Sequence, residues 1–199
     1  MAQCTGCQKK MGFLERTIKL GPQKIPYCVP CARMEEKRQA LTFLLQGGSP
    51  RELFRINRVT MTDPFDQQAK TQLLGDLIFT DKAVIFAQVH EFLIPSGGYG
   101  FMFGLLGAII AQSRANRAKK KALAEVDMMA RQMYGSGLND FLVKTPRLIS
   151  FPKNAITKLK FTWGSLQIKT PERSHVFVLE KGKKTYQQYE REILGYIQI

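Results

Sequence analysis

Histidine and cysteine are scarce in this chain of 199 residues, and their scarcity excludes several classes of protein. All four cysteines lie within the first 31 residues, so no disulfide framework can hold the rest of the chain together. The two histidines, His90 and His175, each stand alone in a strand-like pattern, where a structural or surface role is expected. No catalytic triad, paired-carboxylate motif or catalytic metal motif stands out, so the sequence predicts a protein that is not an enzyme.

Acidic residues are also few, because 30 lysines and arginines face only 16 aspartates and glutamates, which gives a formal net charge of +14. The excess is uneven along the chain. Residues 51–112 carry a net charge of −1, whereas residues 1–50, 113–147 and 148–199 each carry +5. A basic surface attracts nucleic acid and anionic lipid in the same way, so charge alone does not choose between these partners.

Long apolar runs are missing too. The apolar stretch Tyr99–Ala111 has 13 residues, which as a helix would extend about 20 Å against a hydrocarbon core of about 30 Å, too short to span a membrane. The N-terminus, Met1-Ala2-Gln3-Cys4, lacks the apolar segment of a signal peptide. We therefore expect a cytoplasmic protein, free or peripheral at the inner face of the membrane, where paired cysteines bind metal rather than form disulfides.

Two Cys-x-x-Cys pairs separated by twenty residues form the most specific motif of the chain. Zn²⁺ prefers four thiolates at the corners of a tetrahedron, and two cysteines three residues apart can span one edge of it. Because the protein would fill all four positions, we expect one structural Zn²⁺ per chain, bound by Cys4, Cys7, Cys28 and Cys31. Gly6, between the first two ligands, is expected to give the tight turn its conformational freedom. A redox pair and an iron–sulfur site are the alternatives.

The residues around these cysteines predict a hairpin and a helix. Gly12–Leu20 and Lys24–Tyr27 have strand character, and helix formers run from Ala32 to Gln46. Residues 1–46 are thus predicted to contain a Cys-x-x-Cys turn (a knuckle), a hairpin, a second knuckle and a helix, in that order. This order resembles treble-clef or LIM-like zinc fingers. The resemblance implies a small Cys4 zinc finger that binds protein or nucleic acid. Ser49-Pro-Arg-Glu52 then predicts a short helix within a linker of residues 47–69.

Residues 70–199 predict one bent antiparallel sheet and a final helix. Strand-like patterns occur at residues 72–80, 83–89, 147–151, 156–163, 166–170 and 175–179, and an amphipathic helix at Lys183–Ile197. The run from Gly75 to Phe86 resembles the first hairpin of GRAM and bacterial PH-like domains, and Pro152–Phe177 resembles their later strands. This resemblance implies an α+β protein, a zinc finger followed by a PH-like antiparallel β-barrel with a C-terminal helix.

The predicted barrel is interrupted at about residues 95–144 by a glycine-rich apolar helix and a basic helix. Three interpretations remain open: the apolar helix packs on the barrel or on a second copy, it enters a membrane, or the basic helix contacts nucleic acid. The membrane interpretation assigns the contacts to Phe101, Met102, Phe103, Leu105, Leu106, Arg114, Arg117, Lys119, Lys120 and Lys121.

Together these features predict a non-catalytic, zinc-binding adaptor or scaffold that acts at a membrane surface or in a protein complex, with no small-molecule substrate. The alternative is a nucleic-acid-binding protein that uses the zinc finger and the basic helix. Vesicle binding and nucleic-acid mobility shifts, each across a salt series, would separate the two.

Overall fold

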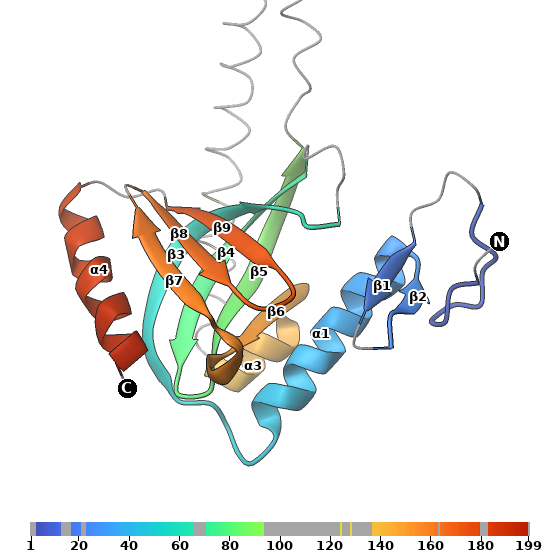
Figure 1. The fold of residues 1–199 in the computed structure, drawn as a ribbon, viewed down its shortest axis with the longest axis horizontal. Coiled ribbons are helices and arrows are strands. Elements are labelled where there is room, and N and C mark those ends of the chain that lie inside the picture. Colours follow the sequence, from blue (N-terminus) through green and yellow to red (C-terminus); the bar gives the residue numbers. More distant parts are fainter. Residues whose placement is uncertain are drawn as a thin grey trace, which may run out of the picture.

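The computed structural model describes residues 3–12, 17–20, 23–65, 71–93, 124, 128, 137–162, 164–179 and 183–198 (Figure 1). The four cysteines and both histidines belong to these ranges. The residues that the membrane interpretation assigns as contacts, from Phe101 to Lys121, lie outside the described residues, as does the glycine-rich helix for which packing on the barrel or on a second copy is the alternative.

The N-terminal part combines a small hairpin with a long helix. Strands β1 (Ile18–Leu20) and β2 (Ile25–Tyr27) pair antiparallel, and helix α1 (Val29–Leu45) follows directly. Pro30 in the first turn of α1 suits a position where the backbone N–H has no partner within the helix. The predicted hairpin and helix are confirmed.

Seven antiparallel strands form the main sheet. They are β3 (Glu52–Thr62), β4 (Thr71–Thr80), β5 (Ala83–Leu93), β6 (Arg147–Pro152), β7 (Lys158–Thr162), β8 (Ser165–Lys169) and β9 (Ser174–Leu179). Their order is β6-β5-β4-β3-β9-β8-β7, so the first strand lies in the centre of the sheet. The two edges, β6 and β7, do not pair with each other. The predicted antiparallel sheet is confirmed, but it is not a closed barrel.

The predicted short helix after Ser49 is wrong, because residues 52–62 form strand β3. Over this strand the register runs from Glu52 opposite Thr80 to Thr62 opposite Gln72. A favourable helix cap contributes only about 1 kcal/mol, which is less than the burial of Ile56, Val59 and Met61 in the sheet core. The sheet therefore begins within the segment predicted as a linker.

A bulge in β3 and a close approach of β5 to Gly75 of β4 shape the sheet near its centre. The register of β3 shifts between Ile56 and Val59, and Arg58 at this bulge has a positive φ of 58°. Asp76 on β4 accepts a hydrogen bond of 3.1 Å from the backbone N–H of Arg58. Next to Asp76, a Cβ on Gly75 would lie 2.1 Å from the carbonyl oxygen of Ala87, so only glycine fits there. Bulges of this kind increase the local twist of a sheet.

Helices cover the sheet on two sides (Figure 1). Helix α4 (Lys183–Gln198) packs Tyr189, Ile193 and Tyr196 into the inner core formed by both halves of the sheet. The outer face of β4, β5 and β6 is covered by α1 and by the short helix α3 (Leu138–Lys144), which falls in the predicted insertion range. A 3-10 turn, η1 (Lys153–Ala155), joins β6 to β7.

Candidate metal centre

The four cysteines converge at the N-terminal end of α1. Their Sγ atoms all lie within 4.8 Å of one another. Cys28 Sγ is 3.5 Å from Cys4 Sγ and 3.8 Å from Cys7 Sγ. Metal–sulfur bonds of about 2.3 Å at tetrahedral angles place two thiolates about 3.8 Å apart. The predicted ligand set is therefore brought together with spacings suited to one metal ion.

The backbone of the two knuckles holds this arrangement. Cys28 caps the N-terminus of α1, which puts Cys31 in the first turn of the helix. The backbone N–H of Cys28 donates a 3.3 Å hydrogen bond to Cys4 Sγ, directly linking the two pairs. The N–H of Thr5 also donates to the carbonyl oxygen of Pro26 in β2, at 3.0 Å. The hairpin thus carries the second pair back to the first.

Gly6 allows the knuckles to close because of its lack of a side chain. A Cβ at this position would lie 2.9 Å from Cys31 Cβ and 3.0 Å from Cys31 Sγ. The φ of Gly6 is not among the positive values of the described glycines. Glycine is therefore required here because Cys31 lies so close to it, and not because of the conformational freedom expected from the sequence.

The thiols differ in acidity. Burial alone would raise the pKa of Cys4, but hydrogen bonds from the backbone N–H groups and side chains of Cys28 and Cys7 lower it to about 6. The hydrogen bond with Cys28 and burial raise the pKa of Cys31 to about 12. A cation bound among the sulfurs would favour the thiolate form of all four cysteines, so metal binding at this site should release protons.

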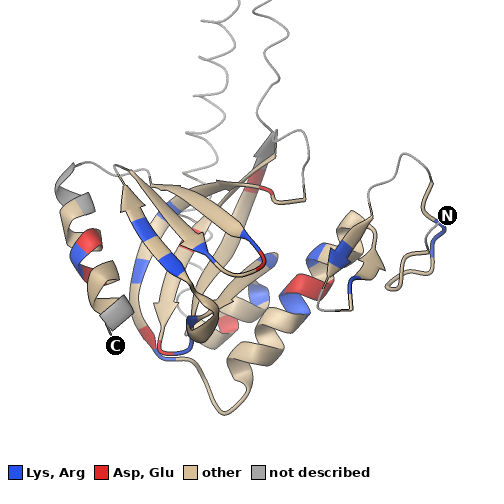
Figure 2. Ribbon diagram, in the orientation of Figure 1, with Lys and Arg blue, Asp and Glu red and all other residues tan. Residues whose placement is uncertain are grey.

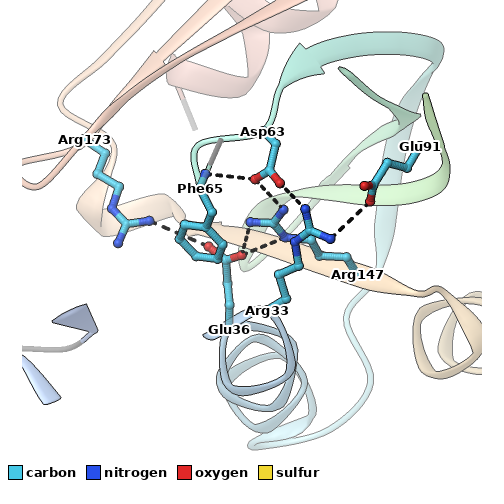
Figure 3. Close-up of polar contacts among 7 residues, drawn as sticks. All are labelled: Arg33, Glu36, Asp63, Phe65, Glu91, Arg147 and Arg173. Carbon is cyan, nitrogen blue, oxygen red and sulfur yellow. Dashed lines mark hydrogen bonds and ion pairs between the residues drawn. The ribbon is translucent and has the colours of Figure 1, made fainter. Parts of the chain in front are cut away.

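An ion-pair network joins the cysteine-bearing helix to the sheet (Figure 3). Arg147 on β6 donates from Nε and Nη2 to Oε2 of Glu36 on α1, at 2.9 and 2.8 Å. It also donates from Nη1 to Oδ1 of Asp63, just after β3, at 2.8 Å. Arg33, one turn before Glu36 in α1, binds the other oxygen of Asp63. The side chains of Asp63 and Arg147 are 0% and 3% exposed, so solvent screens these contacts little.

Further contacts complete the network. Asp63 Oδ1 also accepts from the backbone N–H of Phe65, at 2.9 Å. The Arg147 guanidinium lies over the Phe65 ring, 4.6 Å from its centroid, and Arg173 lies 5.9 Å from it. Arg33 reaches Glu91 on β5 at 3.3 Å. Helix α1, β3, β5 and β6 are therefore tied together at one point.

The two carboxylates that share Arg147 respond differently to their surroundings. Burial would raise the pKa of Asp63, but the hydrogen bond and charge of Arg147, the Phe65 N–H and Arg33 together lower it. Burial raises the pKa of Glu36 against the attraction of Arg147 and Arg173, and the negative charge of Asp63 adds to this increase. Asp63 therefore releases its proton more readily than Glu36.

A cleft of about 490 Å³ lies beside the network, between α1, β6 and the turn that joins β8 to β9. Glu36, Arg173 and His175 line it together with apolar side chains such as Phe43. The His175 ring packs 5.0 Å from Phe151, between centroids. Burial, with the nearby positive charges of Arg173 and Arg147, lowers the pKa of His175 to about 4. This histidine is therefore a neutral, buried residue near pH 7, in line with the structural role predicted for it.

Arg33, Glu36, Asp63 and Arg147 carry no sequence motif that would reveal their association. Arg33 and Glu36 are spaced three apart on a helix, which is the only local signal, and it fits a solvated helix face equally well. Their partners lie 30 and 111 residues away in sequence. Only the tertiary structure brings these charges together.

Comparison of the chain with protein-family models, curated proteins and solved structures finds no match. Among the helices whose residues the structure describes, none is long and apolar enough to cross a membrane.

Proposed function

We propose that this protein is a non-catalytic, zinc-binding adaptor that acts at an anionic membrane surface. The observation that carries the proposal is the double role of α1. Its N-terminal end bears two of the clustered cysteines, while Ala40 and Leu44 near its other end are buried against the outer face of the sheet. A metal at the cysteines would fix the same helix that the sheet uses as its cover, so both parts would present their surfaces as one body.

Zinc is the metal that the donor set favours. Four cysteine sulfurs at tetrahedral spacings select Zn²⁺ or an iron–sulfur centre, and a closed shell of protein ligands suits a structural zinc ion. The knuckle, hairpin and helix arrangement supports a treble-clef or LIM-like zinc finger. A protein-only ligand set leaves no coordination position for substrate, which supports a structural rather than a catalytic metal.

The sheet supports the PH-like interpretation. Counted from β3, its strand order is 4-3-2-1-7-6-5, with the long first strand pairing with both the second and the seventh. Helix α4 packs against the inner core at the end of the chain. A PH-like scaffold hosts many unrelated binding functions, so the fold itself does not specify the partner.

The formal charge of +14 supports an anionic partner. Flotation of the full-length protein with phosphatidylcholine vesicles, with and without phosphatidylserine, tests the proposal. We expect binding only to the phosphatidylserine vesicles, decreasing as salt is raised. Binding to RNA or DNA with no binding to these vesicles would instead identify the protein as a nucleic-acid-binding protein.

Metal analysis of protein purified without added metal should give one zinc per chain, and iron in its place would overturn the zinc assignment.

A further inference from the structure

The outer face of β7, β8 and β9 combines lysines with exposed polar and apolar side chains. Alternate residues of each strand point into the core, as His175, Phe177 and Leu179 of β9 show. The other residues form a surface that we call the lysine face. It consists of Lys158, Lys160, Thr162, Ser165, Gln167, Lys169, Ser174, Val176 and Val178.

The lysine face concentrates positive charge without compensation. Lys158 on β7 lies directly opposite Lys169 on β8, and Lys160 is two residues further along the same face. No member of the face is acidic, and no contact in the described part of the chain pairs any of the three ammonium groups with a carboxylate. Like charges directly opposite across two strands destabilise a sheet, unless a bound anion neutralises them. The face is therefore electrostatically suited to a surface of negative charges.

No described helix covers this face. Helices α1 and α3 pack on the outer side of β4, β5 and β6, and α4 packs into the inner core. Figure 1 shows β7, β8 and β9 in front with no helix over them, and Figure 2 shows blue segments on β7 and β8. The side chains of Val176 and Val178 are each 50% exposed, although each is large and apolar.

The composition of the face distinguishes between two kinds of polyanion. Recognition of nucleic-acid bases relies on arginine for hydrogen bonding and on aromatic rings for stacking, and the face has neither. Lysines with exposed aliphatic side chains beside them suit the boundary between lipid headgroups and acyl chains. We propose that the lysine face docks on the phosphate headgroups of an anionic membrane. This inference rests on the proposed membrane function and names the surface that performs it.

The test replaces Lys158, Lys160 and Lys169 by glutamine in the full-length protein. The matched control replaces Lys10, Lys19 and Lys24, three exposed lysines of the cysteine-bearing part, by glutamine, which removes the same amount of charge. Each lysine near an anionic surface contributes about five-fold to partitioning, so the face variant should bind phosphatidylserine vesicles about 100-fold more weakly. The control variant should stay within about five-fold of the wild type, because its lysines lie outside the contact. Circular dichroism spectra should remain unchanged in both variants, since all six positions are exposed.

Three other outcomes are informative. Failure of the wild type to bind these vesicles would overturn the proposed membrane function, and with it this inference. Equal binding by the face variant and its control would overturn the lysine face alone and leave the membrane function standing. Loss of RNA or DNA binding by the face variant, with vesicle binding unchanged, would reassign the face to nucleic acid.

Discussion

Glu36 in α1 and Arg147 in β6 lie 111 residues apart, yet two N–H groups of Arg147 donate to a single carboxylate oxygen of Glu36. The same guanidinium reaches Asp63, so one side chain of β6 neutralises carboxylates from two other segments. Helix α1 bears the cysteines at its start. This contact is therefore the point at which the stability of the sheet and the position of the metal centre become linked.

Replacement of Arg147 by methionine should destabilise the protein strongly. Methionine keeps much of the length of the side chain but leaves the Glu36 carboxylate and one side of Asp63 buried without their main partner. Removing one partner of a buried charge pair costs about 3–5 kcal/mol. Urea unfolding at pH 7, followed by circular dichroism, measures this loss. A midpoint equal to that of the wild type would show that the network does not hold α1 on the sheet.

Two companion variants separate charge from packing. Arg38→Met breaks an exposed pair with Glu35 within α1 and should leave the urea midpoint close to that of the wild type. Adding Glu36→Gln to Arg147→Met should recover part of the lost stability, because it removes one of the two buried charges.

Gly6→Ala should weaken metal binding without changing any ligand. The added Cβ would lie 2.9 Å from Cys31 Cβ, so the two knuckles would have to move apart. Changes beside a metal site that disturb its ligands lower affinity by about 10- to 100-fold. Gly12→Ala is the control, because a Cβ there meets nothing within 4 Å. Competition with a coloured zinc chelator measures both affinities. Identical affinities in the two variants would contradict the close approach at Gly6.

Local patterns were sufficient to predict the cysteine cluster and most strands. The two Cys-x-x-Cys pairs encode short-range geometry, and alternating apolar residues encode strands whose inner face is buried. Strand β3 was not predicted because Ser49-Pro50, just before it, has the pattern of a helix N-terminus. The strand itself is stabilised by pairing with β4 and β9. Pairing energies of this kind are set by residues distant in sequence, which a local pattern does not contain.

The turn between β4 and β5 also could not be predicted from its local sequence pattern. Asp81-Lys82 is a weak two-residue turn by sequence, yet the loop has this length, because the Thr80 hydroxyl donates to the Ala83 carbonyl at 2.8 Å and accepts from its N–H at 3.0 Å. Lys82 also extends to the end of α1. The charge network around Arg147 is hidden for the same reason, since its members come from five separate segments of the chain.

Lys82→Met should destabilise the end of α1. The Lys82 ammonium group donates to the carbonyl oxygens of Leu44, Gln46 and Gly48 at 3.1, 2.7 and 2.7 Å. Carbonyls at a helix C-terminus have no partner within the helix. Removal of the ammonium group that binds them should therefore lower the free energy of unfolding by about 2 kcal/mol. Hydrogen exchange of the last turn of α1, together with urea unfolding, measures the effect. The exposed Lys19→Met serves as control, and equal effects of the two variants would contradict a capping role for Lys82.

The contribution of His175 to the stability of the protein should fall as the pH drops from about 6.5 to about 4. Burial lowers the pKa of this histidine to about 4, whereas an unfolded histidine titrates near 6.5. Between these values the unfolded chain binds the proton and the folded chain does not, so acid favours unfolding. The full difference corresponds to about 3 kcal/mol, which is present above pH 6.5 and lost at pH 4.

Protonation of metal-bound thiolates occurs over part of the same range, so the wild type must be compared with His175→Leu at each pH. Both proteins share the cysteine site, and the difference between their free energies of unfolding isolates the histidine. Relative to His175→Leu, the wild type should lose most of the 3 kcal/mol between pH 7 and pH 4.5, whatever the offset at pH 7. The lowered pKa of Asp63 contributes equally to both proteins, and only below the ordinary range of an aspartate. A free-energy difference that stays constant with pH would show that the His175 ring takes up its proton as readily in the folded protein as in the unfolded chain.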